Sequence, residues 1–307
     1  MKYFIAFFIF IVVLFFYLHI NHHLTKSNDL EIYTIEKPSK DKLEEICNLR
    51  QPILFDYTNE EILKNCRMET LNNKYSAFDV KIRDVLNEDD KKEIYLPLVL
   101  KESLNLFQSD TKGRYITENN YDFLEETGSL KQYTYNDSFL RPPLVSKCDY
   151  DYMSGSQNSN TPLRYELNYR NYFYVVEGEI QVKMIPPSSS KYLLEEKDYD
   201  NFEFKSPINP WDVDQKYKDY EKVKALDIIV KPGTILYIPP YWWYSIKYTK
   251  MSSICAFKYR TYMNTVTILP EIVMNLLQEQ NIKRETVEKV EIKKEKNLEE
   301  MMKDEKK

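Results

Sequence analysis

Histidine and cysteine are the side chains that most often bind catalytic metals, and their positions restrict the chemistry open to this chain. All three histidines, His19, His22 and His23, lie at the end of an apolar N-terminal segment. The chain after residue 23 therefore cannot supply an imidazole to a metal site. The four cysteines, at positions 47, 66, 148 and 255, are far apart and form no C-x-x-C pair. They predict buried thiols, with one or two disulfides as the alternative in an oxidising compartment.

The composition predicts one substantial globular domain with a tyrosine-rich core. The 307 residues include 26 Tyr but only 5 Gly, and 43% of them are hydrophobic. A chain of this size and composition can bury a sizeable core. The formal net charge is −5, and the basic residues are interspersed with acidic ones. Because there is no basic patch, the sequence excludes nucleic acid as a partner.

Residues 3–20 form an almost unbroken apolar run. As a helix, this run is long enough to cross the ~30 Å hydrocarbon core of a bilayer. A cleaved signal peptide is the alternative, but its apolar core would be shorter, and no small-x-small cleavage site follows. Residues 1–23 are therefore predicted to be the signal anchor of a single-pass membrane protein. Lys2 and the amino terminus nearly balance Lys26, which leaves the orientation open, with a slight preference for a lumenal or external domain.

Residues 24–140 are predicted to be a mixed α and β lead-in region. Alternating polarity over residues 30–34 predicts a strand, and Ser39 is the expected N-cap of a following helix. A longer helix over residues 96–107 would hold Pro97 in its first turn, where a missing donor costs little. The other elements expected here are a strand at 52–55 and a helix at 60–66.

Residues 141–262 are predicted to form a β-barrel, because short runs of alternating polarity are separated by Gly, Pro, Asn and Ser. Gly178 is expected in a tight turn, and residues 188–224 are expected to be a polar excursion. The expected strands are 149–153, 163–168, 172–176, 180–185, 225–230, 235–238, 245–248 and 253–259.

The C-terminal part is predicted to contain one helix, within residues 263–281, and a charged tail. An apolar stripe over residues 270–280 predicts a helix that either caps the barrel or forms a homodimer. Residues 282–307 are mostly Glu and Lys and predict a solvated tail.

Three segments of the β-rich half together resemble the cupin-like domain of the JmjC and asparaginyl-hydroxylase group of iron(II)/2-oxoglutarate oxygenases. They are NTPLRYE at 160–166, GEIQVKMIPP at 178–187 and KPGTILYIPPYWWY at 231–244. They resemble the family patterns T-P-x-H-x-D, G-x-K-x-x-x-L-x-P-P and P-G-D-x-L-Y-I-P-x-x-W-W-H. The resemblance covers roughly residues 140–262. It implies a mainly β fold, the double-stranded β-helix or jelly roll of cupins, preceded by the membrane helix and the α+β lead-in.

The same resemblance places the family's functional positions on residues that depart from its pattern. The two histidine ligands of the iron correspond to Arg164 and Tyr244, and the carboxylate ligand corresponds to Glu166. The lysine that binds 2-oxoglutarate corresponds to Ile180. Loss of these ligands implies that neither iron nor 2-oxoglutarate is bound. Thr161 and Asn171 match polar positions that line the cosubstrate pocket, and Tyr165 and Trp243 are further candidates for lining a pocket.

Strand geometry suggests what replaces the metal. Arg164 and Glu166 are two residues apart, so in a strand they point to the same face. A divalent cation beside Arg164 would be repelled, since two unit charges at about 4 Å repel by roughly 4 kcal/mol at an effective dielectric of 20. We therefore expect an ion pair between Arg164 and Glu166, with the Tyr244 hydroxyl bonded to it.

The preferred functional hypothesis is a non-catalytic cupin-like module, held at a membrane through residues 3–20, that binds a protein or a small anionic ligand. One alternative is a divergent oxygenase or a lyase-like cupin that uses Glu166 and Tyr244 with Tyr165 or Asp227. Another is a structural or envelope-associated membrane protein without a pocket.

Overall fold

The strands lie in two sheets. The computed structural model describes residues 1–86 and 95–281. In these residues the larger sheet has the order β1 (Tyr33–Ile35), β2 (Ile53–Asp56), β13 (Thr234–Ile238), β8 (Arg170–Glu177), β15 (Ser252–Thr261), β6 (Val145–Gly155), β5 (Tyr115–Thr117), β3 (Asp79–Asp84), β4 (Leu96–Val99). The smaller sheet has the order β10 (Glu196–Asp198), β11 (Glu203–Ser206), β7 (Leu163–Tyr165), β14 (Trp243–Tyr248), β9 (Ile180–Ile185), β12 (Leu226–Val230).

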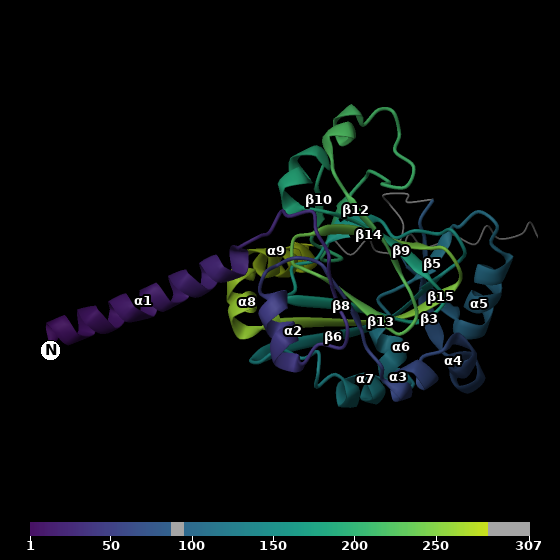
Figure 1. Ribbon diagram of the computed structural model, residues 1–307, viewed down its shortest axis with the longest axis horizontal. Coiled ribbons are helices and arrows are strands. Elements are labelled where there is room, and N and C mark those ends of the chain that lie inside the picture. Colours follow the sequence, from purple (N-terminus) through teal and green to yellow (C-terminus); the bar gives the residue numbers. More distant parts are fainter. Residues whose placement is uncertain (87–94, 282–307) are drawn as a thin grey trace, which may run out of the picture.

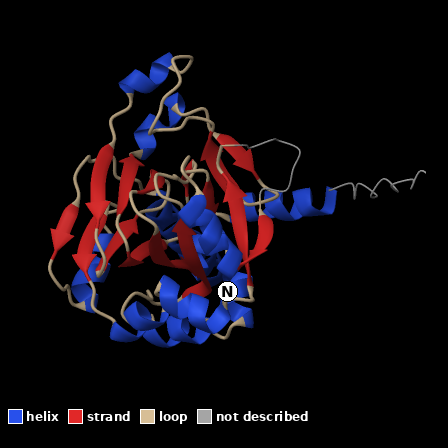
Figure 2. Cartoon of the chain, turned by 90° about the vertical axis from the view of Figure 1, so that its right-hand side faces the viewer, coloured by secondary structure: helices blue, strands red, loops and turns tan. Residues whose placement is uncertain are grey.

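The two sheets pack face to face, as the red strands in Figure 2 show. Phe173 and Val175 of β8 point into the space between them, and so do Val182 and Met184 of β9 and Ile246 of β14. All of these side chains are buried. Because successive residues of a strand point to opposite faces, every second residue of these strands contributes to the interior.

Buried tyrosines lie on the outer face of the larger sheet, as the tyrosine-rich composition predicted. Tyr172 and Tyr174 of β8 and Phe257 of β15 are buried there, packed with side chains from the helices. These helices cover one side of the sheet in Figure 1 and are α2 (Lys40–Cys47), α3 (Glu60–Asn65), α4 (Met68–Tyr75), α5 (Leu100–Ser109), α6 (Tyr121–Glu126) and α7 (Leu130–Asn136). The protein therefore has three layers: helices, the larger sheet and the smaller sheet.

Strands from residues 24–140 extend the larger sheet at both edges. At one edge β2 pairs with β13, with Phe55 opposite Ile235. At the other, β5 pairs with β6, with Ile116 opposite Gly155. The lead-in region and the barrel strands thus share one hydrogen-bonded sheet.

The helix start predicted from the capping residue Ser39 is confirmed, and so is the helix predicted at 60–66. The Ser39 hydroxyl accepts a hydrogen bond from the amide of Lys42 at 3.3 Å, and α2 begins at Lys40, directly after Ser39. The helix predicted at 60–66 is α3, capped by Asn59. Both caps satisfy amide groups that a helix leaves without an internal partner.

The helix predicted over residues 96–107 is wrong in its first turn. Residues 96–99 form β4, and the helix α5 starts only at Leu100. Pro97 lies opposite Lys81 of β3, and β4 is the edge strand of the sheet. A proline is tolerated there because an edge strand can present its missing donor to solvent.

The polar excursion predicted at residues 188–224 contains two strands that the sequence analysis did not identify. They are β10 and β11, and β11 pairs with β7, with Lys205 opposite Arg164. Two short 3-10 helices, η1 (Pro187–Tyr192) and η2 (Lys218–Lys222), complete this segment. The strand predicted at 163–168 is shorter than expected, because β7 ends at Tyr165.

The remaining β predictions agree with the observed strands to within a few residues. Gly178 adopts a φ of +81°, as expected of a tight turn between β8 and β9. The single C-terminal helix predicted is two helices, α8 (Tyr262–Thr267) and α9 (Leu269–Asn281). The charged tail at 282–307 lies outside the described residues.

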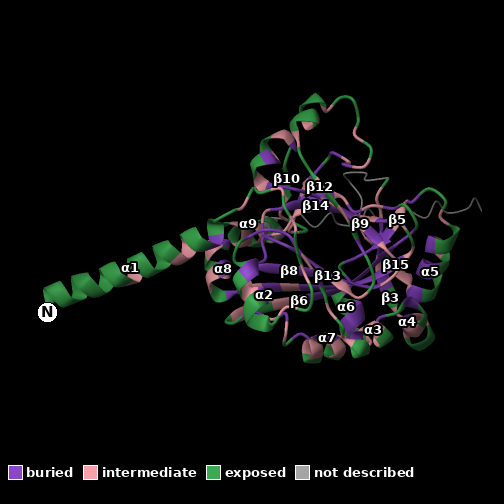
Figure 3. Cartoon of the chain, viewed as in Figure 1, coloured by how far each residue is buried: buried purple, intermediate pink, exposed green. Residues whose placement is uncertain are grey.

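The N-terminal helix α1 (Lys2–Leu24) projects away from the domain (Figure 1). Among the described residues it is the helix long and apolar enough to cross a membrane, with 23 residues and a mean hydropathy of 2.6. Its surface is exposed almost from end to end, in contrast to the buried sheets (Figure 3). These properties fit a membrane-spanning anchor or a signal sequence.

Candidate functional site

A cavity of about 440 Å³ opens at one end of the space between the two sheets. We call it the mouth cavity, and its charged wall residues are Lys81, Lys147, Asp149, Asp151, Arg164, Glu166, Glu203, Lys258 and Arg260. Aromatic rings of Tyr165, Phe202 and Phe204 form part of its rim. The domain therefore keeps a polar pocket beside its apolar interior.

Strand alternation explains why charges line one end of this space. In β15 the inward row runs Ile254, Ala256, Lys258 and Arg260. The first two belong to the apolar interior, and the last two line the mouth cavity. Because every second residue shares a face, one strand passes from an apolar to a charged environment along its length.

Arg164 is buried in the cavity wall, where two carboxylates bond to its guanidinium. Its Nη1 donates to Oε1 of Glu118 at 2.9 Å and its Nη2 to Oε2 at 2.5 Å, a two-point ion pair. Nη1 also donates to Oε1 of Glu203 at 3.1 Å. The Arg164 residue is only 6% exposed. Its charge is therefore neutralised inside the protein rather than offered to solvent.

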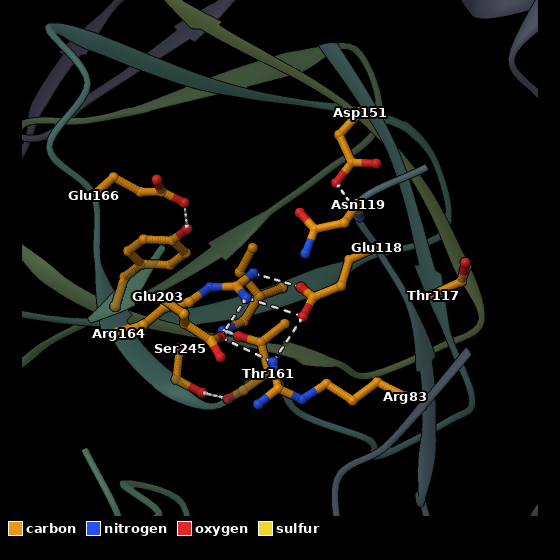
Figure 4. Close-up of polar contacts among 12 residues, drawn as sticks. Arg83, Thr117, Glu118, Asn119, Asp151, Thr161, Arg164, Glu166, Glu203 and Ser245 are labelled. Atoms are coloured by element: carbon orange, nitrogen blue, oxygen red, sulfur yellow. Dashed lines mark hydrogen bonds and ion pairs between the residues drawn. The ribbon is translucent and has the colours of Figure 1, made fainter. Parts of the chain in front are cut away.

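A second arginine completes this cluster (Figure 4). Nη1 of Arg83, on β3, donates to Glu203 at 2.8 Å and to Glu118 at 3.3 Å. The Tyr95 hydroxyl donates to Oε1 of Glu118 at 2.9 Å. We call Arg83, Glu118, Arg164 and Glu203 the arginine–glutamate cluster.

The cluster keeps Glu118 ionised. Burial by itself would raise the pKa of this carboxyl, but Arg164 and then Arg83 outweigh it and lower the pKa to about 2. Two guanidinium groups therefore face two carboxylates, and the buried charges balance.

Glu166 belongs to a separate group, which corrects the predicted ion pair between Arg164 and Glu166. Oε1 of Glu166 accepts from Nζ of Lys258 at 2.7 Å and from the Tyr244 hydroxyl at 3.1 Å. Although burial opposes it, Lys258 lowers the pKa of Glu166, with Arg164 adding to the effect. The expected bond between Tyr244 and Glu166 is confirmed. The reason for the difference is that Glu118 and Lys258, both distant in sequence, supply nearer partners.

Tyr244 lies between the two groups. Its ring is below the Arg164 guanidinium, with 5.8 Å from Cζ to the ring centroid. Its side chain is buried, and burial raises the pKa of its hydroxyl well above the usual range. The hydroxyl is thus a hydrogen-bond donor at neutral pH.

Asp151, on the inward row of β6, is a buried carboxyl in the cavity wall. It accepts hydrogen bonds from the backbone amides of Asn119 at 2.8 Å and Asn120 at 2.7 Å. Burial raises its pKa to about 6, although Lys258 and the two amides favour the carboxylate. Its charge therefore changes close to neutral pH.

Arg260 is the cation at the rim of the cavity. Its Nε donates to Oδ1 of Asn168 at 2.6 Å, and its guanidinium lies over the Phe202 ring, 5.1 Å from the centroid. Across residues 1–86 and 95–281, no carboxylate lies within ion-pair distance of Arg260. Its charge is therefore available to a ligand.

Arg164 and Tyr244, which the resemblance aligns with histidine ligands, do not match the ligands that iron(II) requires. A guanidinium carries no lone pair for a metal, and Arg164 already fills the space between Glu118 and Glu203. In the described part of the chain, no group of three or more His, Cys, Asp or Glu side chains is placed to hold a metal ion. All three histidines belong to α1, outside the barrel.

The cosubstrate positions are likewise occupied by apolar or structural side chains. Ile180 is fully buried between the sheets, next to Val230 and Tyr248 on the neighbouring strands. The Thr161 hydroxyl accepts from the Ile246 amide at 2.9 Å, and Nδ2 of Asn171 donates to the Ile238 carbonyl at 3.2 Å. Thr161 and Asn171 therefore bond to the backbone of neighbouring strands and are not among the residues that line the mouth cavity.

Of the two aromatic candidates, only Tyr165 lines the mouth cavity. Trp243 points to the opposite face from Tyr244, packs with Leu163 and Ile185, and donates from Nε1 to Ser190 at 2.8 Å. Asp227, named for the enzymatic alternative, is exposed on β12 and accepts from Gln181 at 2.7 Å. It lies outside the cavity wall.

Sequence reasoning missed Arg83, Glu118, Glu203, Lys258 and Arg260. The alternation in β15 would have placed Lys258 and Arg260 on the inward row. No local signal marks Glu118 or Arg83, because their place depends on the pairing of β5 with β3 and β6.

Two facing sheets, antiparallel except for the β1–β2 pair, with a polar cavity at one end of the space between them, are consistent with the class of the cupin-like proteins. The model of the cupin-like domain family matches this chain over residues 38–265. The chain therefore belongs to the cupin-like, JmjC-type family, as its sequence motifs predicted.

Proposed function

We propose that this protein is a membrane-anchored, non-catalytic cupin-like module that binds a small organic anion in its mouth cavity. In this proposal the barrel strands form the double-stranded β-helix of cupins, and α1 is a single-pass signal anchor. The iron(II) and 2-oxoglutarate chemistry of related domains is absent.

The observation that carries the proposal is the two-point pair between Arg164 and Glu118. In this proposal, the neutralised guanidinium of Arg164 occupies the position at which catalytic relatives hold their metal. Displacing Arg164 would leave Glu118 and Glu203 buried with fewer partners, and breaking a buried pair costs about 3–5 kcal/mol. Metal binding would have to overcome that cost and the charge of Arg83.

The choice of an organic anion rests on the rim of the cavity. Arg260 has no acidic partner among the described residues, and it can bind a carboxylate through two parallel hydrogen bonds. The rings of Tyr165, Phe202 and Phe204 offer apolar contact to the body of the ligand. A cavity of about 440 Å³ is within the range that binds small molecules.

The test uses the full-length protein in lipid nanodiscs. Binding of Mn(II), a stable substitute for iron(II), is followed by electron paramagnetic resonance, and release of succinate from 2-oxoglutarate is assayed with added iron(II) and ascorbate. Binding of 4-fluorobenzoate, as a probe anion, is followed by broadening of its fluorine resonance. We expect no stoichiometric Mn(II) binding, no succinate above the protein-free rate, and saturable broadening.

The control variants separate the cavity from the rest of the surface. Arg260→Gln should abolish the broadening, and Lys231→Gln, which changes an exposed cation outside the cavity wall, should preserve it. Stoichiometric Mn(II) with succinate release would establish the oxygenase alternative instead. Broadening that persists in Arg260→Gln would refute the proposed anion site.

A further inference from the structure

Several exposed apolar side chains lie on the two C-terminal helices, α8 and α9. Tyr262 and Val266 of α8 are 64% and 38% exposed. On α9, Leu269, Val273, Leu276 and Leu277 are each between 42% and 51% exposed. We call these six residues the α8–α9 apolar face. Contiguous exposed apolar surface of this kind marks contact with a membrane or a partner.

The helical spacing shows that this face is turned away from the domain. At 100° per residue, the four α9 members fall within about a third of the helix circumference. Ile272 packs against the domain, and Nδ2 of Asn275 donates to the Tyr199 carbonyl at 2.6 Å on that side. Gln278 is exposed and lies on the side of α9 opposite the apolar face. One side of α9 therefore packs against the domain, and the apolar face is exposed.

The face lies where α1 leaves the domain. Helix α8 contacts α1 directly, and α9 follows α8 in the chain. The ring of His23, at the end of α1, packs edge-on against Tyr169 with 5.0 Å between centroids. The Tyr169 hydroxyl bonds to Asn48, and the next residue, Leu49, is 51% exposed. Exposed apolar side chains of α8 and of the segment after α2 therefore lie near the exit of α1.

The direction of α9 fits a flat surface at this end of the domain. In Figure 1, α1 runs along the horizontal axis and α9 is foreshortened beside its inner end. In Figure 2, turned by 90°, α9 is the helix that lies across the view at the right. Helix α9 therefore runs across the direction of α1, as an interfacial helix does beside a transmembrane one.

We propose that the α8–α9 apolar face inserts into the interfacial layer of the same bilayer that α1 crosses, so that the domain rests on the membrane. This inference depends on the proposed membrane anchor. A lipid surface is favoured over a second copy of the chain because a spanning α1 already brings the bilayer to this face, with no further association needed.

The test labels the full-length chain with the fluorophore NBD at single cysteines in a Cys148→Ser background. The other native cysteines are buried. The labelled positions are Leu276→Cys on the apolar face, Gln278→Cys on the same helix, and Ile229→Cys, an exposed apolar site on β12. Each protein is reconstituted in phosphatidylcholine nanodiscs with and without nitroxide-bearing lipids.

We expect nitroxide lipids to cause a large loss of NBD fluorescence at position 276, a smaller loss at 278 and none at 229. Equal loss at 276 and 229 would overturn the inference. So would protection of position 276 from aqueous iodide without lipid quenching, together with energy transfer between labelled copies, because a second copy would then cover the face.

A flotation assay on liposomes distinguishes failure of the inference from failure of the anchor. If the full-length chain floats but position 276 is not quenched, α1 anchors the protein and the lipid face is wrong. If the chain does not float, the anchor itself is wrong, and the inference falls with it.

Discussion

Glu118 and Arg164 face each other across the barrel mouth and form a two-point ion pair, although 46 residues separate them in the chain. Glu118 follows β5 of the lead-in region, and Arg164 belongs to β7 of the barrel. The pair thus joins the larger sheet to the smaller one. Arg83 and Glu203 form a second ion pair beside it, with 2.8 Å between Nη1 and Oε1, so the four charges sum to zero.

Replacing Glu118 should destabilise the protein strongly. In Glu118→Gln, two buried guanidinium groups would share a single carboxylate, and the free energy of unfolding should fall by about 3–5 kcal/mol. The measurement is denaturant unfolding in detergent, followed by the fluorescence of the buried Trp242 and Trp243. Glu126→Gln, on the exposed end of α6, is the matched control and should change stability by less than about 0.5 kcal/mol. Equal effects of the two variants would show that the cluster contributes nothing specific.

Lys258 and Glu166 should behave as a coupled pair. Lys258→Met leaves Glu166 buried without its cation, and Glu166→Gln leaves Lys258 buried without its anion. Each change should cost about 2–4 kcal/mol, and the double variant should cost clearly less than the sum of the two. A double-mutant cycle of unfolding free energies measures the coupling. Additive effects would mean that the 2.7 Å contact carries no interaction energy.

Asp151 should make the folded protein less stable as the pH rises. This is the opposite of the effect of an ion-paired carboxyl, whose pKa is lowered on folding. Its folded-state pKa of about 6 lies above the usual unfolded value of about 4. Between these values the folded protein binds more protons, so this group's contribution is largest below pH 4 and is lost as the pH rises through 6. Relative to Asp151→Asn, the wild type should lose up to about 3 kcal/mol from pH 4 to 7.5.

Unfolding curves of the two proteins at several pH values check this expectation. The comparison is with the variant because Glu118, whose pKa is lowered, acts on both proteins alike as the pH falls. Parallel stability profiles of wild type and Asp151→Asn would contradict it.

The turn at Gly178 should tolerate no side chain. Gly178 has a φ of +81°, and a Cβ there would collide with the hydroxyl and backbone of Ser252. Gly128 has a similar φ of +70° but open space around it. Gly128→Ala should therefore cost about 1 kcal/mol from the backbone alone, and Gly178→Ala clearly more. Thermal unfolding compares the two, and equal shifts in the midpoint would refute the steric argument.

Local signals were sufficient for much of the fold. Ser39 predicted the start of α2 through its capping hydroxyl, and the alternation of β9 predicted both of its ends correctly. Pro97 misled because proline suits both a first helical turn and an edge strand, and only the neighbouring strand β3 decides between them. Strands β10 and β11 are short and polar, so their pairing with each other and with β7 left no periodic trace.

Only part of the candidate site could be predicted from the sequence. The motif that contains Arg164 drew attention to this segment, and spacing correctly placed Arg164 and Glu166 in the same cavity wall. Their partners could not be foreseen, because Glu118 and Lys258 reach them through pairings between strands far apart in the chain. The partner of a charged residue is the one nearest in space, and the spacing of residues along the chain does not give that distance.

The arginine–glutamate cluster also links the part of the chain before residue 141 to the part after it. Arg83 and Glu118 come from residues before 141, and Arg164 and Glu203 come from residues after it. A fragment starting at residue 141 would bury Arg164 and Glu203 without their other partners and would expose two edges of the larger sheet. We therefore expect residues before and after 141 to unfold together as one cooperative unit.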